Sequence, residues 1–197
     1  MHGRSHAVLF LLLSCAPESM MQSSCTIPKS GSFFRTYPSI FMDTVTERSD
    51  YERERGKPLP SLNHGQIQFL ISGALHSYRE KYTIASELTI ELGDRHVTPD
   101  VCVYPKMEVD YQRDVTRMTE PPLLAVEIVS PTQSTQDVVD KINDMLDAGV
   151  ESCWLVQPAM ETVTIYTPDA KPHTVPEGTV EDPATDIEVE ISAIFDA

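Results

Sequence analysis

The sequence has no hydrophobic run long enough to cross a lipid bilayer. Near its start the only apolar run is 7–13, whereas a spanning helix needs about 20 apolar residues. We therefore expect no membrane partner. The run precedes Ser14-Cys15, so one interpretation is a short, lipoprotein-like signal peptide. We favour a disordered or over-extended tail over 1–41, because the segment that Met42 opens is typical of the start of a soluble domain, which we place at 42–197.

Cysteine is scarce, and its spacing argues against the common cysteine-based sites. The four cysteines form neither a CxxC pair nor a Cys/His pattern, as zinc sites and disulfide frameworks would require. Cys102 and Cys153 lie in apolar, strand-like runs, so we expect buried thiols. Unpaired thiols are typical of a reducing compartment, which favours the cytoplasm.

Positive charge is also scarce. The chain has 15 Lys and Arg against 30 Asp and Glu, a net charge of −15, which disfavours non-specific attraction to phosphate backbones. A nucleic-acid partner would need a local basic groove, which the sequence alone does not locate. The cations available for one are Arg53, Arg55, Lys57, Arg79, Lys81, Arg95, Lys106, Arg113 and Arg117.

The apolar pattern predicts one α/β or α+β domain. A chain of 197 residues, 41% apolar, is long enough for one real core. The pattern predicts a helix from a cap at Asn63, strands over 87–92 and 100–104, a long connection over 108–122, a strand over 123–129, a helix over 135–148, strands over 150–156 and 162–166, an irregular stretch over 167–186 and a packed end over 187–195.

The first helix has a clear predicted start. Asn63 with Gln66 three residues on matches a capping box. His64 beside it is interpreted as a capping or surface residue rather than a ligand. Gly73 within the helix indicates close packing, because glycine costs about 1 kcal/mol against alanine there.

A carboxylate interrupts the most apolar strand. The run 123–129 reads LLAVEIV, which is typical of a central strand buried on both faces. Leaving Glu127 unpaired there would cost several kcal/mol. A lysine partner, a set of hydrogen bonds or a metal ion would each compensate.

Two further residues suit the same site. Asp100 enters a strand directly after Pro99, and Lys141 lies about 40° outside the apolar arc of its helix, within reach of the strand before it. Asp, Glu and Lys together can bind a hard divalent cation and orient a water molecule. From residue types alone, a structural ion pair or a solvated lysine remains an alternative.

Four motifs in order carry a family resemblance. They are PDV at 99–101, AVEIVSP at 125–131, DxxxK at 137–141 and AGVxxxWLV at 148–156, after the lead-in YERERGKPLPSLNHG at 51–65. Together they resemble the Uma2 family of restriction-endonuclease-like proteins, and the likeness runs from Met42 to Phe195.

The resemblance implies a PD-(D/E)XK nuclease fold, a central mixed sheet flanked by helices. It implies that Asp100 and Glu127, with the Ile128 carbonyl, bind Mg²⁺ or Mn²⁺. It places the catalytic lysine at Lys141, on the following helix, since Val129 stands at the usual position. Glu87 is a further candidate carboxylate.

The implied activity is a magnesium-dependent endodeoxyribonuclease that hydrolyses phosphodiesters of nucleic acid, with DNA as the expected partner and 5′-phosphate products. A homodimer is compatible with the fold but has no residue signal. The loop at 131–136 lacks the arginines that relatives often carry. The alternative is therefore a catalytically inactive nuclease-fold protein that binds protein or nucleic acid and keeps Glu127 and Lys141 as an ion pair.

Overall fold

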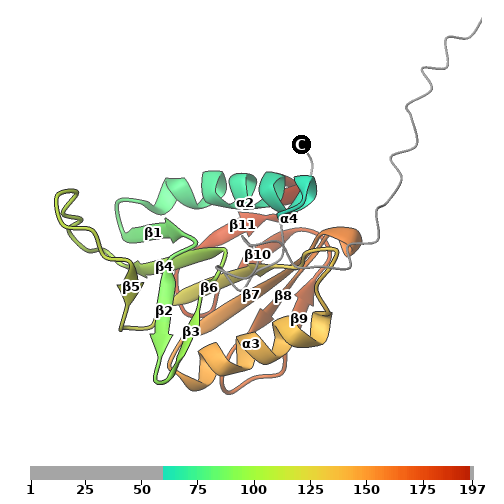
Figure 1. Cartoon of the computed structure of the whole chain (residues 1–197). Helices are drawn as coiled ribbons and strands as arrows, with labels where there is room; N and C mark the ends of the chain where they lie inside the picture. The colour runs from blue at the N-terminus through green and yellow to red at the C-terminus, as the bar shows by residue number, and fades with distance from the viewer. Residues whose placement is uncertain (1–59, 196–197) are drawn as a thin grey trace, which may run out of the picture. The chain divides into compact units, whose positions relative to one another are not determined.

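A six-stranded mixed sheet forms the centre of the computed structural model, which describes residues 60–195. The strand order is β1-β4-β6-β7-β8-β9 (Figure 1). Only β6 and β7 run parallel, and the other neighbours are antiparallel. The strands are β1 (Tyr82–Ser86), β4 (Val101–Pro105), β6 (Leu124–Ile128), β7 (Ser152–Gln157), β8 (Thr162–Tyr166) and β9 (His173–Val175). The predicted tail over 1–41 lies outside the described residues.

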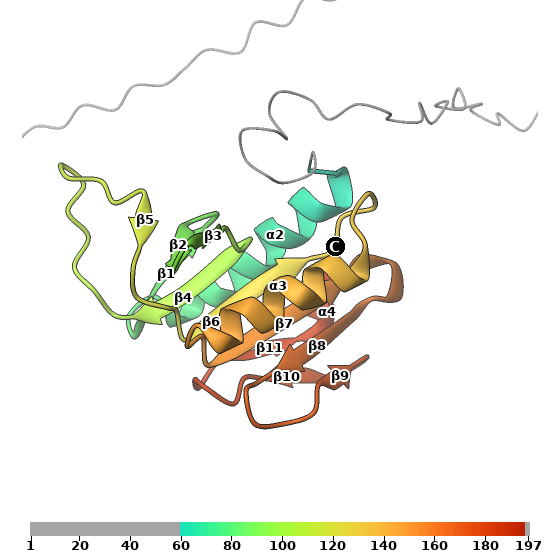
Figure 2. The same cartoon turned by 60° about the horizontal axis from the view of Figure 1, so that its bottom comes forward.

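Helices cover both faces of this sheet. Helices α2 (Leu62–Leu75) and α4 (Ile191–Phe195) lie on one face, and α3 (Thr135–Asp147) lies on the other (Figures 1 and 2). The core on the α2 side also includes the ribbon of β10 (Thr179–Glu181) and β11 (Glu188–Glu190). The core on the α3 side contains Val138, Ile142 and Met145. The predicted mixed sheet between helices is confirmed.

Strand β6 has the buried character expected of 123–129. All five of its residues are buried, and it lies between β4 and β7. Its side chains alternate, so that Leu124, Val126 and Ile128 join the α2-side core while Ala125 joins the α3-side core. Glu127, between Val126 and Ile128, therefore belongs to the α3 side.

A second, three-stranded sheet lies beside the first. It contains β3 (Arg95–Val97), β2 (Thr89–Leu92) and β5 (Arg117–Met118) in that order. Gly93, with φ of 60°, makes the turn between β2 and β3, as the Gly-Asp pair predicts. Thr98, directly after β3, leads the chain toward Asp100.

Helix α2 begins earlier than predicted. Its N-cap is Ser61, whose side chain accepts a hydrogen bond from the backbone N–H of His64. The prediction of Asn63 as the cap is wrong, because Asn63 already lies within the helix. The close packing expected at Gly73 is also absent, since a Cβ there would meet nothing within 4 Å.

Helix α3 matches its prediction closely. Ser134 caps it, and its buried residues face the sheet. Gly149 follows it with φ of 100°, a conformation that favours glycine. After β8, the stretch expected to be irregular contains β9 and β10, which pair with β8 and β11. The packed end over 187–195 is confirmed as β11 and α4.

Candidate active site

The two predicted carboxylates come from neighbouring strands. Asp100 directly precedes β4, Glu127 lies within β6, and each residue is 3% exposed. Val101 pairs with Val126 in the antiparallel register of β4 and β6. One step further along this register lie Asp100 and Glu127, so both belong to the same end of the strand pair.

Lys141 reaches across from α3 to this strand end. Its Nζ lies 2.5 Å from Oε1 of Glu127 and donates a hydrogen bond of 2.9 Å to the carbonyl oxygen of Thr98. The lysine side chain is 19% exposed. The expected reach of Lys141 toward the preceding strand is therefore observed, and a lysine partner is what lets a carboxylate stand within β6.

Asp100 is held through both its side chain and its backbone. Its Oδ2 accepts a hydrogen bond of 2.7 Å from the backbone N–H of Ile128, the residue after Glu127. Its carbonyl oxygen accepts from Nε2 of Gln68 at 2.9 Å and from the N–H of Glu87 at 3.1 Å. Helix α2, strand β6 and the turn after β1 thus meet at one aspartate.

His64 also belongs to this cluster, contrary to the prediction of a capping or surface residue. Its side chain is 9% exposed, and Nε2 lies 3.2 Å from Oδ2 of Asp100. The helical period could have revealed this place. His64 precedes Ile67 by three residues and Ile71 by seven, so it continues the buried face of α2 toward its start.

The donor set suits a hard divalent cation such as Mg²⁺ or Mn²⁺. Magnesium is usually held by one or two carboxylates and several water molecules. Asp100 and Glu127 supply two buried carboxylates on adjacent strands. Within residues 60–195 no three His, Cys, Asp or Glu side chains form a group able to hold a metal ion. The fit is therefore to an ion held mainly by two carboxylates and water.

The nearby thiol is not a reactive group. Burial raises the pKa of Cys153, and the negative charge of Glu127 raises it further. The thiol therefore stays protonated, which makes it a poor nucleophile and metal ligand. Cys102 and Cys153 are both buried, as the sequence predicts.

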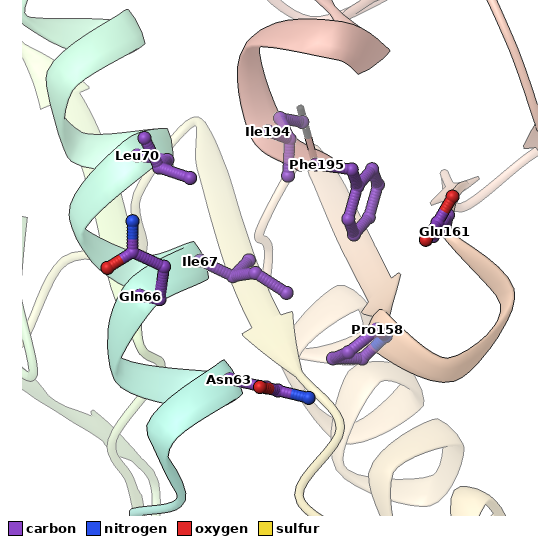
Figure 3. Close-up of a pocket in the computed structure, with 8 residues that line it drawn as sticks. All are labelled: Asn63, Gln66, Ile67, Leu70, Pro158, Glu161, Ile194 and Phe195. Atoms are coloured by element: carbon purple, nitrogen blue, oxygen red, sulfur yellow. The ribbon is translucent and has the colours of Figure 1, made fainter. Parts of the chain in front are cut away.

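A groove on the other side of α2 is separate from this cluster. It lies between α2, α4 and the short 3₁₀ helix η2 (Pro158–Met160), and its volume is about 200 Å³ (Figure 3). Ile67, Leu70 and Phe195 give it apolar walls, and Asn63 and Gln66 line its rim. None of Asp100, Glu127 and Lys141 lines this groove.

Comparisons with known proteins bear on the family and the fold of this chain. The family model Uma2, described as "Putative restriction endonuclease", matches residues 41–193. A crystal structure of a "putative nuclease belonging to DUF820" from Anabaena variabilis ATCC 29413 is similar, with a TM-score of 0.60 and 26% sequence identity. The match covers 71% of this chain and 84% of that one. No curated protein matches.

None of the helices of the described region combines the length and the apolar character that crossing a bilayer would take.

Proposed function

Since this chain belongs to the Uma2 family, we propose that it is a metal-dependent endonuclease that hydrolyses phosphodiester bonds of DNA. The observation that carries the proposal is the meeting of Asp100, Glu127 and Lys141 at one end of the β4–β6 pair. Two carboxylates and an ammonium group, all largely buried, form the set that metal-assisted hydrolysis uses.

Asp100 and Glu127 are the residues that would hold Mg²⁺ or Mn²⁺. Such an ion lowers the pKa of bound water and offsets charge on the phosphate. The Ile128 carbonyl is proposed as a further ligand. The backbone N–H of Ile128, the residue after Glu127, donates to the Asp100 carboxylate and so limits its rotation, which supports a role in holding an ion.

Lys141 would orient the attacking water. Its ammonium bridges the Glu127 carboxylate and the Thr98 carbonyl, which direct it from two sides. A cation held this way stabilises the negative charge that develops on the phosphate during attack. Lys141 lies on α3 rather than on β6. The loop at 131–136 therefore lies between Lys141 and Glu127 in the sequence, although their side chains are in contact.

A direct test compares nuclease activity on single-stranded and duplex DNA and on RNA, with Mg²⁺ and with Mn²⁺. We expect Asp100→Asn, Glu127→Gln and Lys141→Met each to lower the rate by about 100-fold or more. The exposed residues Glu151 and Lys171 provide matched controls. Glu151→Gln and Lys171→Met should keep wild-type activity.

Equal activity in the wild type and the three site variants would contradict this assignment. No activity in any folded protein, with or without either metal, would favour the second candidate, a nuclease-fold binding module. The direct contact between Lys141 and Glu127 is the observation that favours that candidate, because a structural ion pair would have the same geometry.

A further inference from the structure

We propose that His64 is a positioning residue that fixes the Asp100 carboxylate for metal binding. This inference deepens the proposed function and rests on it. His64 comes from α2, a helix that contributes no residue to the predicted Asp, Glu and Lys set. Its role is to act through Asp100 rather than on the substrate.

Two nitrogen atoms from different elements lie close to one oxygen of Asp100. Nε2 of His64 lies 3.2 Å from Oδ2, and the backbone N–H of Ile128 donates to the same oxygen at 2.7 Å. One nitrogen belongs to α2 and the other to β6. A carboxylate that is contacted from two elements cannot rotate freely about its terminal bond, so the fold sets its orientation.

Helix α2 also holds the backbone of the same aspartate. Gln68, one turn after His64, donates from Nε2 to the carbonyl oxygen of Asp100 at 2.9 Å. Residues four apart share one face of a helix. Ile67 and Ile71 anchor that face in the core. Helix α2 therefore contacts both the carboxylate and the carbonyl of Asp100, and its own position is fixed by its buried face.

The second ring nitrogen of His64 shows that packing alone does not explain this residue. Nδ1 is buried and has no hydrogen-bond partner among residues 60–195. A buried polar atom without a partner costs about 1–3 kcal/mol, and a leucine would fill the space without that cost. Contact of Nε2 with Asp100 is the interaction that histidine adds over leucine at this position.

The test measures Mn²⁺ binding to the full chain without substrate, by electron paramagnetic resonance of the free ion. Removing a partner of a metal ligand typically lowers affinity about 10- to 100-fold, and we expect that loss in His64→Leu. His64→Gln should bind close to wild type, because its amide can donate from nearly the same place. The side chain of His64→Asn is one methylene shorter than that of His64→Gln, so the Mn²⁺ affinity of the Asn variant should stay low.

His76→Leu is the matched control, since His76 is exposed and follows the same helix. It should bind Mn²⁺ as the wild type does. Far-UV circular dichroism and urea denaturation check that every variant folds. Should His64→Leu fail to fold, the comparison of His64→Gln with His64→Asn still decides, because both are polar amides that differ in reach.

Wild-type Mn²⁺ affinity in folded His64→Leu would overturn the positioning role, as would equal affinities of the Gln and Asn variants. A wild type that binds no Mn²⁺ would overturn it too. Mn²⁺ binding that depends on His64 in a protein without nuclease activity would instead support the positioning role while the proposed function fails. The two ideas are therefore separable.

Discussion

Glu87 and Glu161 adopt a left-handed backbone conformation that residues other than glycine rarely take. Their φ angles are 54° and 52°, in the left-handed region that costs a residue with a Cβ about 1–2 kcal/mol. Glu87 uses this conformation in the turn after β1, where its N–H donates to the Asp100 carbonyl. Glu161 uses it to end η2. The first of these two residues borders the candidate active site and the second does not.

Glycine at either position should stabilise the protein. Relief of the left-handed strain exceeds the cost of glycine flexibility, so we expect Glu87→Gly and Glu161→Gly each to raise the free energy of unfolding by about 0.5–1 kcal/mol. Urea denaturation measures this change. A lower stability in both would contradict the strain argument. Nuclease activity lost in Glu87→Gly but kept in Glu161→Gly would show that the Glu87 carboxylate takes part in the reaction.

The first turn of α2 holds His64, whose side chain lies beside Asp100. Ser61 caps the helix by accepting from the N–H of His64, so the cap acts on the backbone of the residue that contacts Asp100. Both Ser61 and Asn63 are good capping residue types. The sequence favoured Asn63 because Gln66 completes a capping box with it, yet the helix begins at Leu62.

Removing the true cap should cost stability where removing the predicted one does not. Ser61→Ala is expected to lower the free energy of unfolding by about 1 kcal/mol. Asn63→Ala should change it little, because Asn63 is exposed and lies inside the helix. Thermal and urea denaturation measure both. The reverse order of effects would mean that α2 begins at Asn63 in solution.

At the scale of the molecule, acidic residues neutralise much of the scarce positive charge. Four of the cations available for a basic groove are paired with carboxylates: Arg79 with Glu80, Lys81 with Asp186, Arg95 with Asp144 and Arg117 with Glu91. Lys106 donates to the Arg79 carbonyl. Arg53, Arg55 and Lys57 lie outside the described residues. In the proposed function, a divalent ion at Asp100 and Glu127 would therefore supply positive charge for a bound phosphate.

This charge balance predicts weak salt dependence of DNA binding. Each phosphate neutralised by Lys or Arg contributes about −0.9 to the slope of log affinity against log salt concentration. For an oligonucleotide in EDTA we expect a slope of magnitude below about 2, measured by fluorescence anisotropy between low and physiological NaCl. Addition of Ca²⁺ should raise the affinity. A steep slope without divalent ions would instead reveal a basic groove.

Local pattern was sufficient for the parts of this protein that depend on near neighbours in sequence. The continuous apolar run of β6 and the period of α3 are properties of adjacent residues, so their bounds were predictable within one or two positions. Glu127 stood out because a carboxylate in an apolar strand needs compensation. Lys141 was within reach because a helix after a strand folds back over it, and Asp100 stood out because it enters a strand directly after Pro99.

Only tertiary contacts decided the rest, because they join residues whose separation in sequence carries no signal. Strand β1 forms by pairing with β4, and β9 and β10 form by pairing with β8 and β11. His64 comes to lie against Asp100 because α2 packs across the sheet opposite α3. The sequence pattern therefore indicated three candidate site residues, whereas the contact of His64 with Asp100 arises only when α2 packs near the start of β4.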